Sequence, residues 1–310
     1  MGSDCLLEEK RTDPLLMTLI ERFKSSNIIV KLIAVNAVVF VVANLAFAFM
    51  ALLGEFSFEL ASWNIRLGGT AQMNELVMRP WTVVTYMFTH FDFGHIFWNM
   101  LILFFLGKVF LHLFDSRKLL SVYLVGGLAG FLLFAIAYNV FPTLDPVRTH
   151  MVGASASIMA IVLAVATYAP NYSIQLVIFG PVKMWLVGTL YVIADIAAIK
   201  YFDNTGGHLA HLGGAAYGFI WASQIKQGKN IGQWMERLVD RLANLFKKGT
   251  RARMKVVKNE KRGGKSDAEY NVEKKANQAK VDAILDKISK SGYDSLTKTE
   301  KDILFKQGDR

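Results

Sequence analysis

Long apolar stretches separated by short polar connections dominate the first 225 residues of the chain, and they predict membrane helices. A bilayer core about 30 Å thick requires roughly 20 apolar residues in one helix. We therefore predict an all-α, polytopic membrane protein with a six-helix bundle in residues 28–224. The predicted spans are Ile28–Leu53, Gly94–Leu113, Leu119–Phe141, Gly153–Tyr168, Pro181–Ile199 and Leu209–Gln224.

The fourth predicted span, Gly153–Tyr168, is too short to cross a bilayer by itself. Its 16 residues rise by about 1.5 Å each, so the helix covers roughly 24 Å. Such a helix begins or ends inside the membrane, where non-helical backbone is tolerated only if protein buries it or a water-filled cavity meets it. The short span therefore marks a candidate site.

The chain after the bundle changes character. Apolar positions recur at helical spacing from Ile231 to Phe246 with Arg and Lys nearby, which predicts an amphipathic helix for an anionic membrane surface. Residues 251–275 are polar and basic, as in a linker. A short helix ending near Gly292 and a capping box of Thr297 with Glu300 then predict a small helical hairpin. We predict four segments: 1–27, 28–224, 225–275 and 276–310.

Composition and charge agree with this organisation. Charged residues make up 19% of the chain and hydrophobic residues 53%, so disorder and a nucleic-acid-binding role are excluded for most of it. The single Cys, Cys5, excludes a disulfide framework and a Cys-based zinc site. The net charge of +10 falls entirely from Lys226 onward, so the bundle is neutral and the tail is basic.

Lys and Arg are unevenly distributed between the two ends of the spans, and this bias orients the bundle. It predicts that both termini are cytosolic and that the second, fourth and sixth spans begin on the outer side. The cytosolic side carries Lys10, Arg11, Arg22, Lys24, Lys31, Lys108, Arg117, Lys118 and Lys183, and the outer side carries Arg66, Arg79, Arg148 and Lys200.

Polar side chains inside the spans gather near the outer ends of the even-numbered helices. Polar groups in a membrane are costly, so each is a functional hypothesis. The three clusters lie at similar depth, which brings a hydroxyl, imidazoles and an amide to one level. They are His90, His95 and Asn99 at the outer mouth of the second span, Ser155 at the N-terminal end of the fourth, and His208 and His211 at the outer mouth of the sixth.

This set is suited to acyl transfer. A serine hydroxyl becomes a nucleophile when a base within hydrogen-bond reach takes its proton, and histidine is the usual base. His95 and Asn99 are four residues apart and share a helix face, so both can donate to an oxyanion together with the Ser155 N–H. Gly153 permits a close approach of the chain to a substrate. We predict a dyad, because no acid is obviously placed to orient the base and nothing in the sequence fixes Asp195 near His211.

Each of these residues also has a structural interpretation. Serine among small residues of a membrane helix is more often a packing residue than a nucleophile, and His90 alone could anchor the chain at the interface. The four-residue repeat of Ala210, Gly214, Gly218 and Ala222 predicts close helix packing. His208 is expected at the surface without a role.

Three motifs, in this order, resemble those of the rhomboid intramembrane proteases. They are the stretch from Trp81 to His90 followed by His95 and Asn99, the stretch Gly153-Ala154-Ser155-Ala156, and the stretch Ala210-His211-Leu212-Gly213-Gly214. The resemblance covers roughly residues 28–224 and implies a bacterial-type rhomboid with a short C-terminal extension. Gly54–Thr89 would then be the family's interfacial loop and the fifth helix its substrate gate.

The resemblance also implies roles for individual residues. Ser155 would be the nucleophile and His211 the general base. His95, Asn99 and the Ser155 amide would form the oxyanion hole, with His90 as a hydrogen-bonding support. The family hydrolyses peptide bonds in or near the transmembrane helices of other proteins, so the implied partners are membrane-spanning substrates and the lipid bilayer. No metal, cofactor or nucleic acid is implied, and the C-terminal hairpin is expected to dock onto a cytosolic partner.

Three positions depart from the family pattern. Many members have Arg after the tryptophan, whereas Thr82 follows Trp81 here and Arg79 is the available substitute. The serine is commonly followed by Gly, here Ala156. Many members stack a Tyr on the catalytic imidazole one turn later, where this chain has Met159. None of these differences removes a reacting group.

Two other functions compete with proteolysis. A catalytically silent rhomboid-like module would hold membrane helices as a binding or chaperone protein, but it need not retain both Ser155 and His211. A transporter would require charged residues at the midplane and repeat symmetry, and the sequence has neither. The N-terminal stretch is not Arg-rich and acid-poor, so we expect a bacterial plasma membrane rather than a mitochondrion.

Overall fold

The computed structural model of the chain describes residues 21, 23, 25–53, 66–145, 149–176, 180–201, 204–246 and 267–308. The chain divides into two units that are each compact, Met1–Lys248 and Gly249–Arg310. The predicted four-segment division remains a prediction. Trp63 and the predicted linker up to residue 266 lie outside the described residues.

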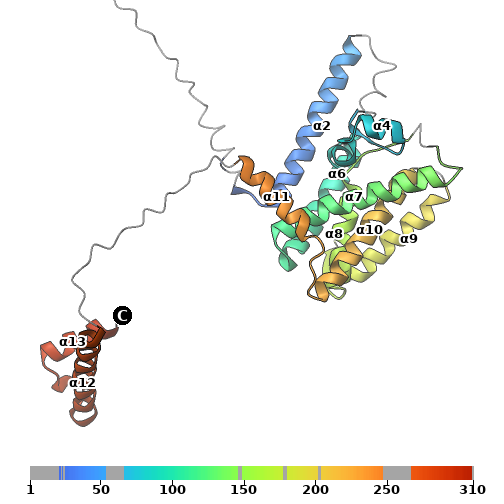
Figure 1. Ribbon diagram of the computed structural model, residues 1–310. Helices are drawn as coiled ribbons and strands as arrows, with labels where there is room; N and C mark the ends of the chain where they lie inside the picture. Colours follow the sequence, from blue (N-terminus) through green and yellow to red (C-terminus); the bar gives the residue numbers. More distant parts are fainter. Residues whose placement is uncertain are drawn as a thin grey trace, which may run out of the picture. The chain divides into compact units, whose positions relative to one another are not determined.

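The first unit is built mainly from helices (Figure 1). Two short antiparallel ribbons accompany them, β1 (Gly69–Thr70) with β2 (His150–Met151) and β3 (Ser173–Leu176) with β4 (Gly180–Lys183). The helices are α2 (Ile28–Leu52), α4 (Met73–Met78), α5 (Thr82–Thr85), the 3-10 turn η1 (Tyr86–Phe88), α6 (Phe93–Leu113), α7 (Ser116–Val140), α8 (Ser155–Tyr168), α9 (Met184–Ile199), α10 (Thr205–Lys226) and α11 (Gln233–Phe246).

The all-α membrane class is confirmed. Within the described ranges, the helices α2, α6 and α7 are long and apolar enough to cross a membrane. The apolar helices α8 and α9 have only 14 and 16 residues, and the glycine- and histidine-rich α10 has 22. The number of six spans therefore remains a prediction.

Local chemistry sets the helix boundaries. Asn27, Asp92 and Asp115 each accept a hydrogen bond from a backbone N–H in the first turn of the helix that follows, as expected of N-caps. The predicted fifth span started at Pro181, but Gly180–Lys183 pairs with β3 as a strand and α9 begins only at Met184. Pro181 has no N–H to donate, and the positive φ of 69° at Gly180 turns the chain into the ribbon.

The short helix α8 lies at the centre of the first unit. Ten of its 14 residues are buried, and it packs against α6, α7, α9 and α10. Because these neighbouring helices cover α8, it does not need the length of a helix that crosses a bilayer by itself. Figure 1 shows α8 alongside α7 and α10.

Close backbone contact joins α8 to α10. A Cβ added at Gly214 would lie 2.0 Å from the carbonyl oxygen of Ala156, and one at Gly218 would lie 2.1 Å from that of Ala160. Real Cβ atoms do not approach a carbonyl oxygen this closely, so both positions require glycine. The two contacts advance together along both chains, so the helices run parallel and start at the same end. This agrees with the packing predicted from the small-residue repeat.

The connection before α6 is tied to the segment that leads into α8. Gly69 pairs with Met151 and Thr70 with His150 in the β1–β2 ribbon. The backbone N–H of Gly153 donates to the carbonyl oxygen of Tyr86 at 2.9 Å. These bonds fix the backbone that leads into the α8 N-terminus.

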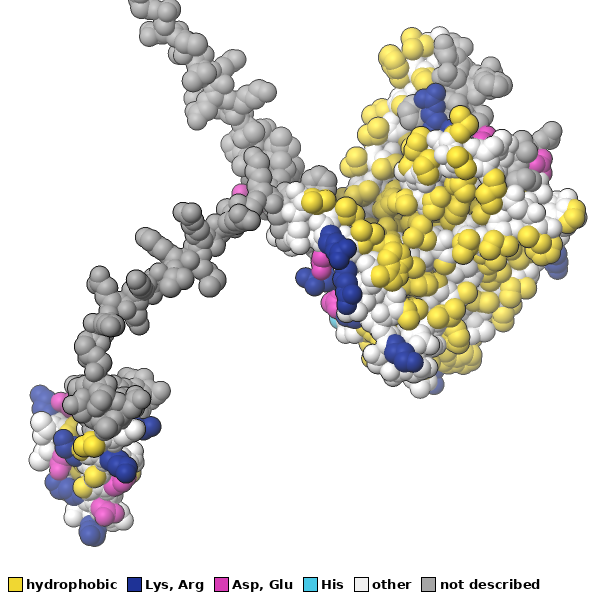
Figure 2. Space-filling view, in the orientation of Figure 1, with side chains coloured by type: hydrophobic (Ala, Val, Ile, Leu, Met, Phe, Trp, Pro, Cys, Tyr) yellow, Lys and Arg dark blue, Asp and Glu magenta, His cyan; other side chains and the backbone are white. Residues whose placement is uncertain are grey.

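Apolar side chains cover much of the first unit's surface (Figure 2). The predicted amphipathic helix is present as α11, with its apolar residues Trp234, Leu238 and Leu242 exposed. It is fastened to α7, since Arg117 pairs with Asp240 at 3.3 Å and Ser121 donates to the carbonyl oxygen of Gly232 at 3.0 Å. Its contact with an anionic membrane remains a prediction.

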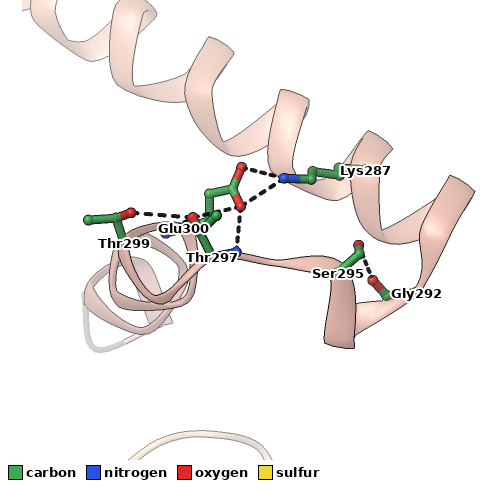
Figure 3. A network of polar contacts seen from close by, with 6 residues as sticks. All are labelled: Lys287, Gly292, Ser295, Thr297, Thr299 and Glu300. Atoms are coloured by element: carbon green, nitrogen blue, oxygen red, sulfur yellow. Dashed lines mark hydrogen bonds and ion pairs between the residues drawn. The ribbon is translucent and has the colours of Figure 1, made fainter.

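The second unit contains the predicted hairpin. Its elements are α12 (Asp267–Ser291), the 3-10 turn η2 (Tyr293–Ser295) and α13 (Lys298–Gly308). The capping box is confirmed, because the Thr297 N–H donates to Glu300 at 2.7 Å and the same carboxylate accepts two bonds of 3.0 Å from Lys287 of α12 (Figure 3). The chain turns between the helices at Gly292, where φ is 76°.

Candidate active site

The candidate residues surround a cavity of about 870 Å³ in the first unit. Its wall is formed by η1, α6, α7, α8, α9, α10 and the segment around β2. The side chains of Ser155, His211, His95 and Asn99 all line it, together with Gly153. Three helices that are distant in sequence thus bring the predicted hydroxyl, imidazoles and amide to one space.

Ser155 is the first residue of α8, and the preceding loop fixes its position. Gly153 has a φ of 112°, which side chains other than glycine rarely adopt. A Cβ at this position would also lie 2.6 Å from the His95 ring. Glycine therefore serves two purposes here, because it allows the turn into α8 and lets the imidazole touch the backbone beside Ser155.

His95 and Asn99 extend from α6 on one face. Asp92 caps the helix by accepting from the His95 N–H at 2.8 Å. The Asn99 amide donates to the His95 carbonyl oxygen at 2.9 Å, and its second N–H can be directed at the cavity. Both residues can therefore donate to a negatively charged oxygen near Ser155.

His90 does not line the cavity but supports its wall. Its side chain is fully buried, and its Nε2 accepts a hydrogen bond from the Ala154 N–H at 3.3 Å. Its ring also meets the His95 ring edge to face, with centroids 5.0 Å apart. His90 thus braces both the loop before Ser155 and the neighbouring imidazole.

A carboxylate that the predicted dyad does not include lies beside His211. Asp195 of α9 lies with Oδ1 2.9 Å from the Nδ1 of His211. Its side chain is only 8% exposed. A bond from Nδ1–H to a carboxylate fixes the ring and leaves Nε2 as the free base. The expectation that nothing places Asp195 near His211 is therefore wrong.

His208 was also misjudged as a surface residue. Its side chain is 21% exposed, and its Nδ1 lies 2.8 Å from the same Asp195 oxygen. His208 and His211 are three residues apart on α10, so they face α9 together. One signal in the sequence could have revealed this cluster, because a carboxylate in an apolar helix needs a partner and histidines were the available ones.

The residues that depart from the family pattern have defined positions and contacts in the structure. Met159 is buried and lines the cavity one turn after Ser155, where its flexible thioether fills the space of a larger ring. Trp81 donates from its indole N–H to the Arg66 carbonyl oxygen at 2.9 Å. Thr82 donates to the Arg79 carbonyl oxygen at 2.8 Å, so this part of the loop is held by backbone carbonyls.

Comparison with known proteins matches the two parts of the chain to different families. Residues 78–227 match the family model of the rhomboid domain, and residues 265–306 match a family of unknown function, DUF6576. RHOMBOID-like protein 12, mitochondrial, of Arabidopsis thaliana is 33% identical over 158 residues, which cover 48% of this chain and 47% of that protein. Presenilin-associated rhomboid-like protein A, mitochondrial, of Danio rerio is 31% identical over 141 residues, 43% of this chain and 34% of that protein. The chain thus spans half or less of the length of these relatives.

These relatives overturn the expected location. Both are named as mitochondrial proteins of eukaryotes, so the expectation of a bacterial plasma membrane is wrong. Hydropathy shows that a helix spans a membrane, and the Lys and Arg bias shows which side is positive. Neither pattern distinguishes one membrane from another, which is why the sequence misled on this point.

Proposed function

We propose that the chain, whose residues 78–227 match the rhomboid domain, is an intramembrane serine endopeptidase. Its substrates are transmembrane proteins, cleaved in or near their membrane-spanning helix. The observation that carries the proposal is that Ser155, His211, His95 and Asn99 line a single cavity. A protein that only binds helices has no need of this combination.

The reaction begins at Ser155. Its Oγ adds to the carbonyl carbon of the scissile peptide bond while Nε2 of His211 accepts the hydroxyl proton. The carbonyl oxygen becomes negatively charged and is stabilised by donors from His95, Asn99 and the Ser155 N–H. When the tetrahedral intermediate collapses, His211 passes the proton to the leaving amine and an acyl-enzyme remains. Water then attacks the acyl-enzyme by the same proton path and regenerates Ser155.

Asp195 acts in this scheme as a positioning residue. Its bond to His211 Nδ1 selects the ring tautomer whose Nε2 can accept a proton. It also stabilises the imidazolium that forms when the serine proton is taken. His90 and Gly153 serve the loop before Ser155, through the bond to Ala154 and the close approach of His95.

The route for a transmembrane substrate is along α9. This helix exposes the large apolar side chains of Leu190, Ile193 and Ile196, which suit contact with lipid or with another membrane helix. The same helix contributes Tyr191 and Asp195 to the cavity wall. A substrate helix beside α9 would therefore lie next to the reacting groups.

Hydrolysis of a fluorogenic transmembrane peptide in proteoliposomes tests the proposal. We expect Ser155→Ala to lower the rate by about 10⁴-fold or more. Ser157→Ala is the matched control, since that side chain is fully buried two residues along the same helix and is not part of the cavity wall. Equal rates for the wild type and Ser155→Ala would reject the protease and favour the helix-binding alternative.

A further inference from the structure

We propose that Asp195, His208 and His211 form a binding site for a divalent transition-metal ion, best suited to Zn²⁺, and that the bound ion inhibits the enzyme. The binding site is inferred from geometry alone. The inhibition rests in addition on the proposed role of His211 as the base. The ion is here a regulator of the site and takes no part in the reaction.

The three side chains present the ligand atoms that zinc prefers. Their donor atoms all lie within 4.8 Å of one another. Two imidazoles come from neighbouring turns of α10 and one carboxylate from α9. Zinc binds His nitrogen at about 2.0–2.1 Å and carboxylate oxygen at about 2.0–2.2 Å in tetrahedral sites. Three protein ligands leave the fourth position for a water molecule from the cavity.

The distances require only a small adjustment. Donor atoms on one tetrahedral zinc lie roughly 3.3 Å apart, as the bond lengths imply. In the structure, Nδ1 of His208 and Nδ1 of His211 lie 2.8 and 2.9 Å from Oδ1 of Asp195. An opening of about half an ångström therefore brings both imidazole nitrogens to a metal-binding separation from the carboxylate oxygen. The two nitrogens lie within 4.8 Å of one another and close on the ion as it binds.

A second observation points to a ligand at this place. Oδ2 of Asp195 is buried and has no hydrogen-bond partner among the described residues. A buried carboxylate oxygen without a partner is unfavourable. Asp195 is 8% exposed and contributes to the cavity wall beside His211. A cation entering from the cavity would supply the missing partner.

The ligand set also determines which ions bind. Two imidazole nitrogens and one carboxylate suit zinc and its neighbours such as cobalt. Calcium takes six to eight oxygen ligands and magnesium demands an octahedral oxygen shell, so the cluster discriminates against both. Mg²⁺ is therefore a control ion for the experiments.

Binding would remove the base by moving one proton. A neutral imidazole carries a single N–H, which in His211 lies on Nδ1 and points at Asp195. When a metal ion takes Nδ1, the proton moves to Nε2 through solvent. Nε2 then donates and can no longer accept the proton of Ser155. No redox step is involved, and removal of the ion restores the original tautomer.

Direct binding measurements on the full chain test the site without reference to activity. The protein is purified in detergent, stripped with a chelator and titrated with Co²⁺, whose visible absorption reports a tetrahedral N/O site. Zn²⁺ binding is then measured by calorimetry, with Mg²⁺ as the control ion.

We expect one ion per chain. We expect His208→Asn and Asp195→Asn to weaken binding by about 100-fold or more. His150→Asn is the matched control, because His150 lines the same cavity outside the cluster. Unchanged affinity in both cluster variants would overturn the site.

A second measurement separates this proposal from the proposed function. Fluorophosphonate labelling is followed with and without Zn²⁺, each variant relative to its own rate in chelator. We expect Zn²⁺ to suppress labelling of the wild type at least tenfold and to have little effect on His208→Asn. One-to-one binding with undiminished labelling would overturn the inhibition. A metal-free wild type that never labels would speak against the protease, while the calorimetry would still decide the metal site.

Discussion

A buried carboxylate in an apolar helix needs hydrogen-bond donors, and Asp195 faces two imidazoles. The bonds of 2.8 and 2.9 Å reach a single oxygen of this side chain. At the residue scale, this cluster joins α9, the helix proposed to face a substrate, to α10, which carries the proposed base. Substitutions in this cluster can change its charge and its hydrogen-bond pattern separately.

Replacing Asp195 by Asn tests its positioning role. The amide keeps the shape but can present an N–H to His211, which favours the wrong tautomer. We expect kcat to fall by about 10²–10⁴-fold with KM nearly unchanged. The pH dependence of kcat should also change, because the imidazolium loses its counter-charge. Asp240→Asn on α11 is the control, and wild-type kcat in Asp195→Asn would contradict the role.

Replacing His95 by Ala tests the oxyanion hole. This side chain touches the Gly153 backbone and does not move the proton, so its loss should weaken only the transition state. We expect kcat to fall by about 10²–10³-fold, with probe labelling of Ser155 slowed but still dependent on His211. An equal loss in His112→Ala, at the other end of α6, would show a general effect on the fold.

At this scale the sequence predicted the residues that line the cavity better than the contacts that hold them. Ser155, Asn99 and His211 are rare polar residues in apolar spans, so their depth could be estimated by counting turns. The pairing of Asp195 with two histidines depends on how α9 rotates about its axis. Packing sets that rotation, and no spacing within one helix reveals it.

Among the elements, α8 and α10 determine whether the site forms at all. Gly214 touches the residue that follows Ser155, and it lies one turn after His211 on α10. The interhelical distance at this point therefore sets how far the imidazole is from the hydroxyl. A larger side chain at position 214 would therefore separate the Ser155 hydroxyl from the His211 imidazole without removing either group.

Gly214→Leu is the corresponding variant. Its Cβ alone would lie 2.0 Å from the Ala156 carbonyl oxygen, so the helices must separate. Overpacking of this kind typically costs about 1–3 kcal/mol of stability, and we expect activity to be abolished. Ala216→Leu adds the same side chain on an exposed position of α10 and should retain activity. Wild-type turnover in Gly214→Leu would argue against the packing described here.

The cap of α13 makes a pH-dependent prediction for the second unit. The Thr297 N–H and the Lys287 ammonium lower the pKa of Glu300 from its ordinary 4.5 to about 2. A depressed carboxylate pKa stabilises the fold above the unfolded pKa, and this contribution is lost as the pH falls through the folded pKa. The cap should therefore be intact above pH 4.5 and lost towards pH 2.

Hydrogen exchange in the full chain measures this effect. We expect Glu300→Gln to lower the protection of the first turn of α13 at neutral pH. The difference from the wild type should shrink as the pH approaches 2, after correction for intrinsic exchange rates. Asp302→Asn, at an exposed position of the same helix, is the control. A difference independent of pH would show that the charge of Glu300 is not responsible.

The elements illustrate where sequence patterns succeed and fail. The boundaries of α2, α6 and α7 fall close to the predicted ones, because apolar runs and Asp or Asn caps mark them. The ribbon before α9 was missed because Val182 and its neighbours are as apolar as a span. Hydropathy reports burial in lipid or protein, whereas strand pairing there depends on the turn at Gly180.

For the whole molecule, the cavity is built from residues between Tyr86 and His211, well before the second unit begins. A chain ending at residue 246 should therefore label with a fluorophosphonate at a rate within about twofold of the full chain, as for changes away from a site. A chain ending at residue 224 loses the contacts of α11 with Arg117 and Ser121 and should be less stable to heat. Absence of labelling in the chain that ends at residue 246 would show that the second unit contributes to activity.

The sequence predicted the class of the whole molecule but not its membrane. A neutral apolar body was sufficient for the fold class, and the three ordered motifs were sufficient to find the resemblance to the rhomboid domain that residues 78–227 match. The compartment of a protein is set by targeting signals that import receptors recognise. The overall hydropathy and net charge of the chain do not contain this information. The number of spans is likewise open, because three apolar helices meet the length and hydropathy needed to cross a membrane in the described residues.

Mapping of the labelled residue is the most direct test of the account. The purified full chain is treated with a fluorophosphonate, digested and analysed by mass spectrometry. We predict a single adduct on Ser155 that is absent from His211→Ala, although the hydroxyl remains. An adduct on Ser157, or equal labelling of the wild type, Ser155→Ala and His211→Ala, would contradict the account.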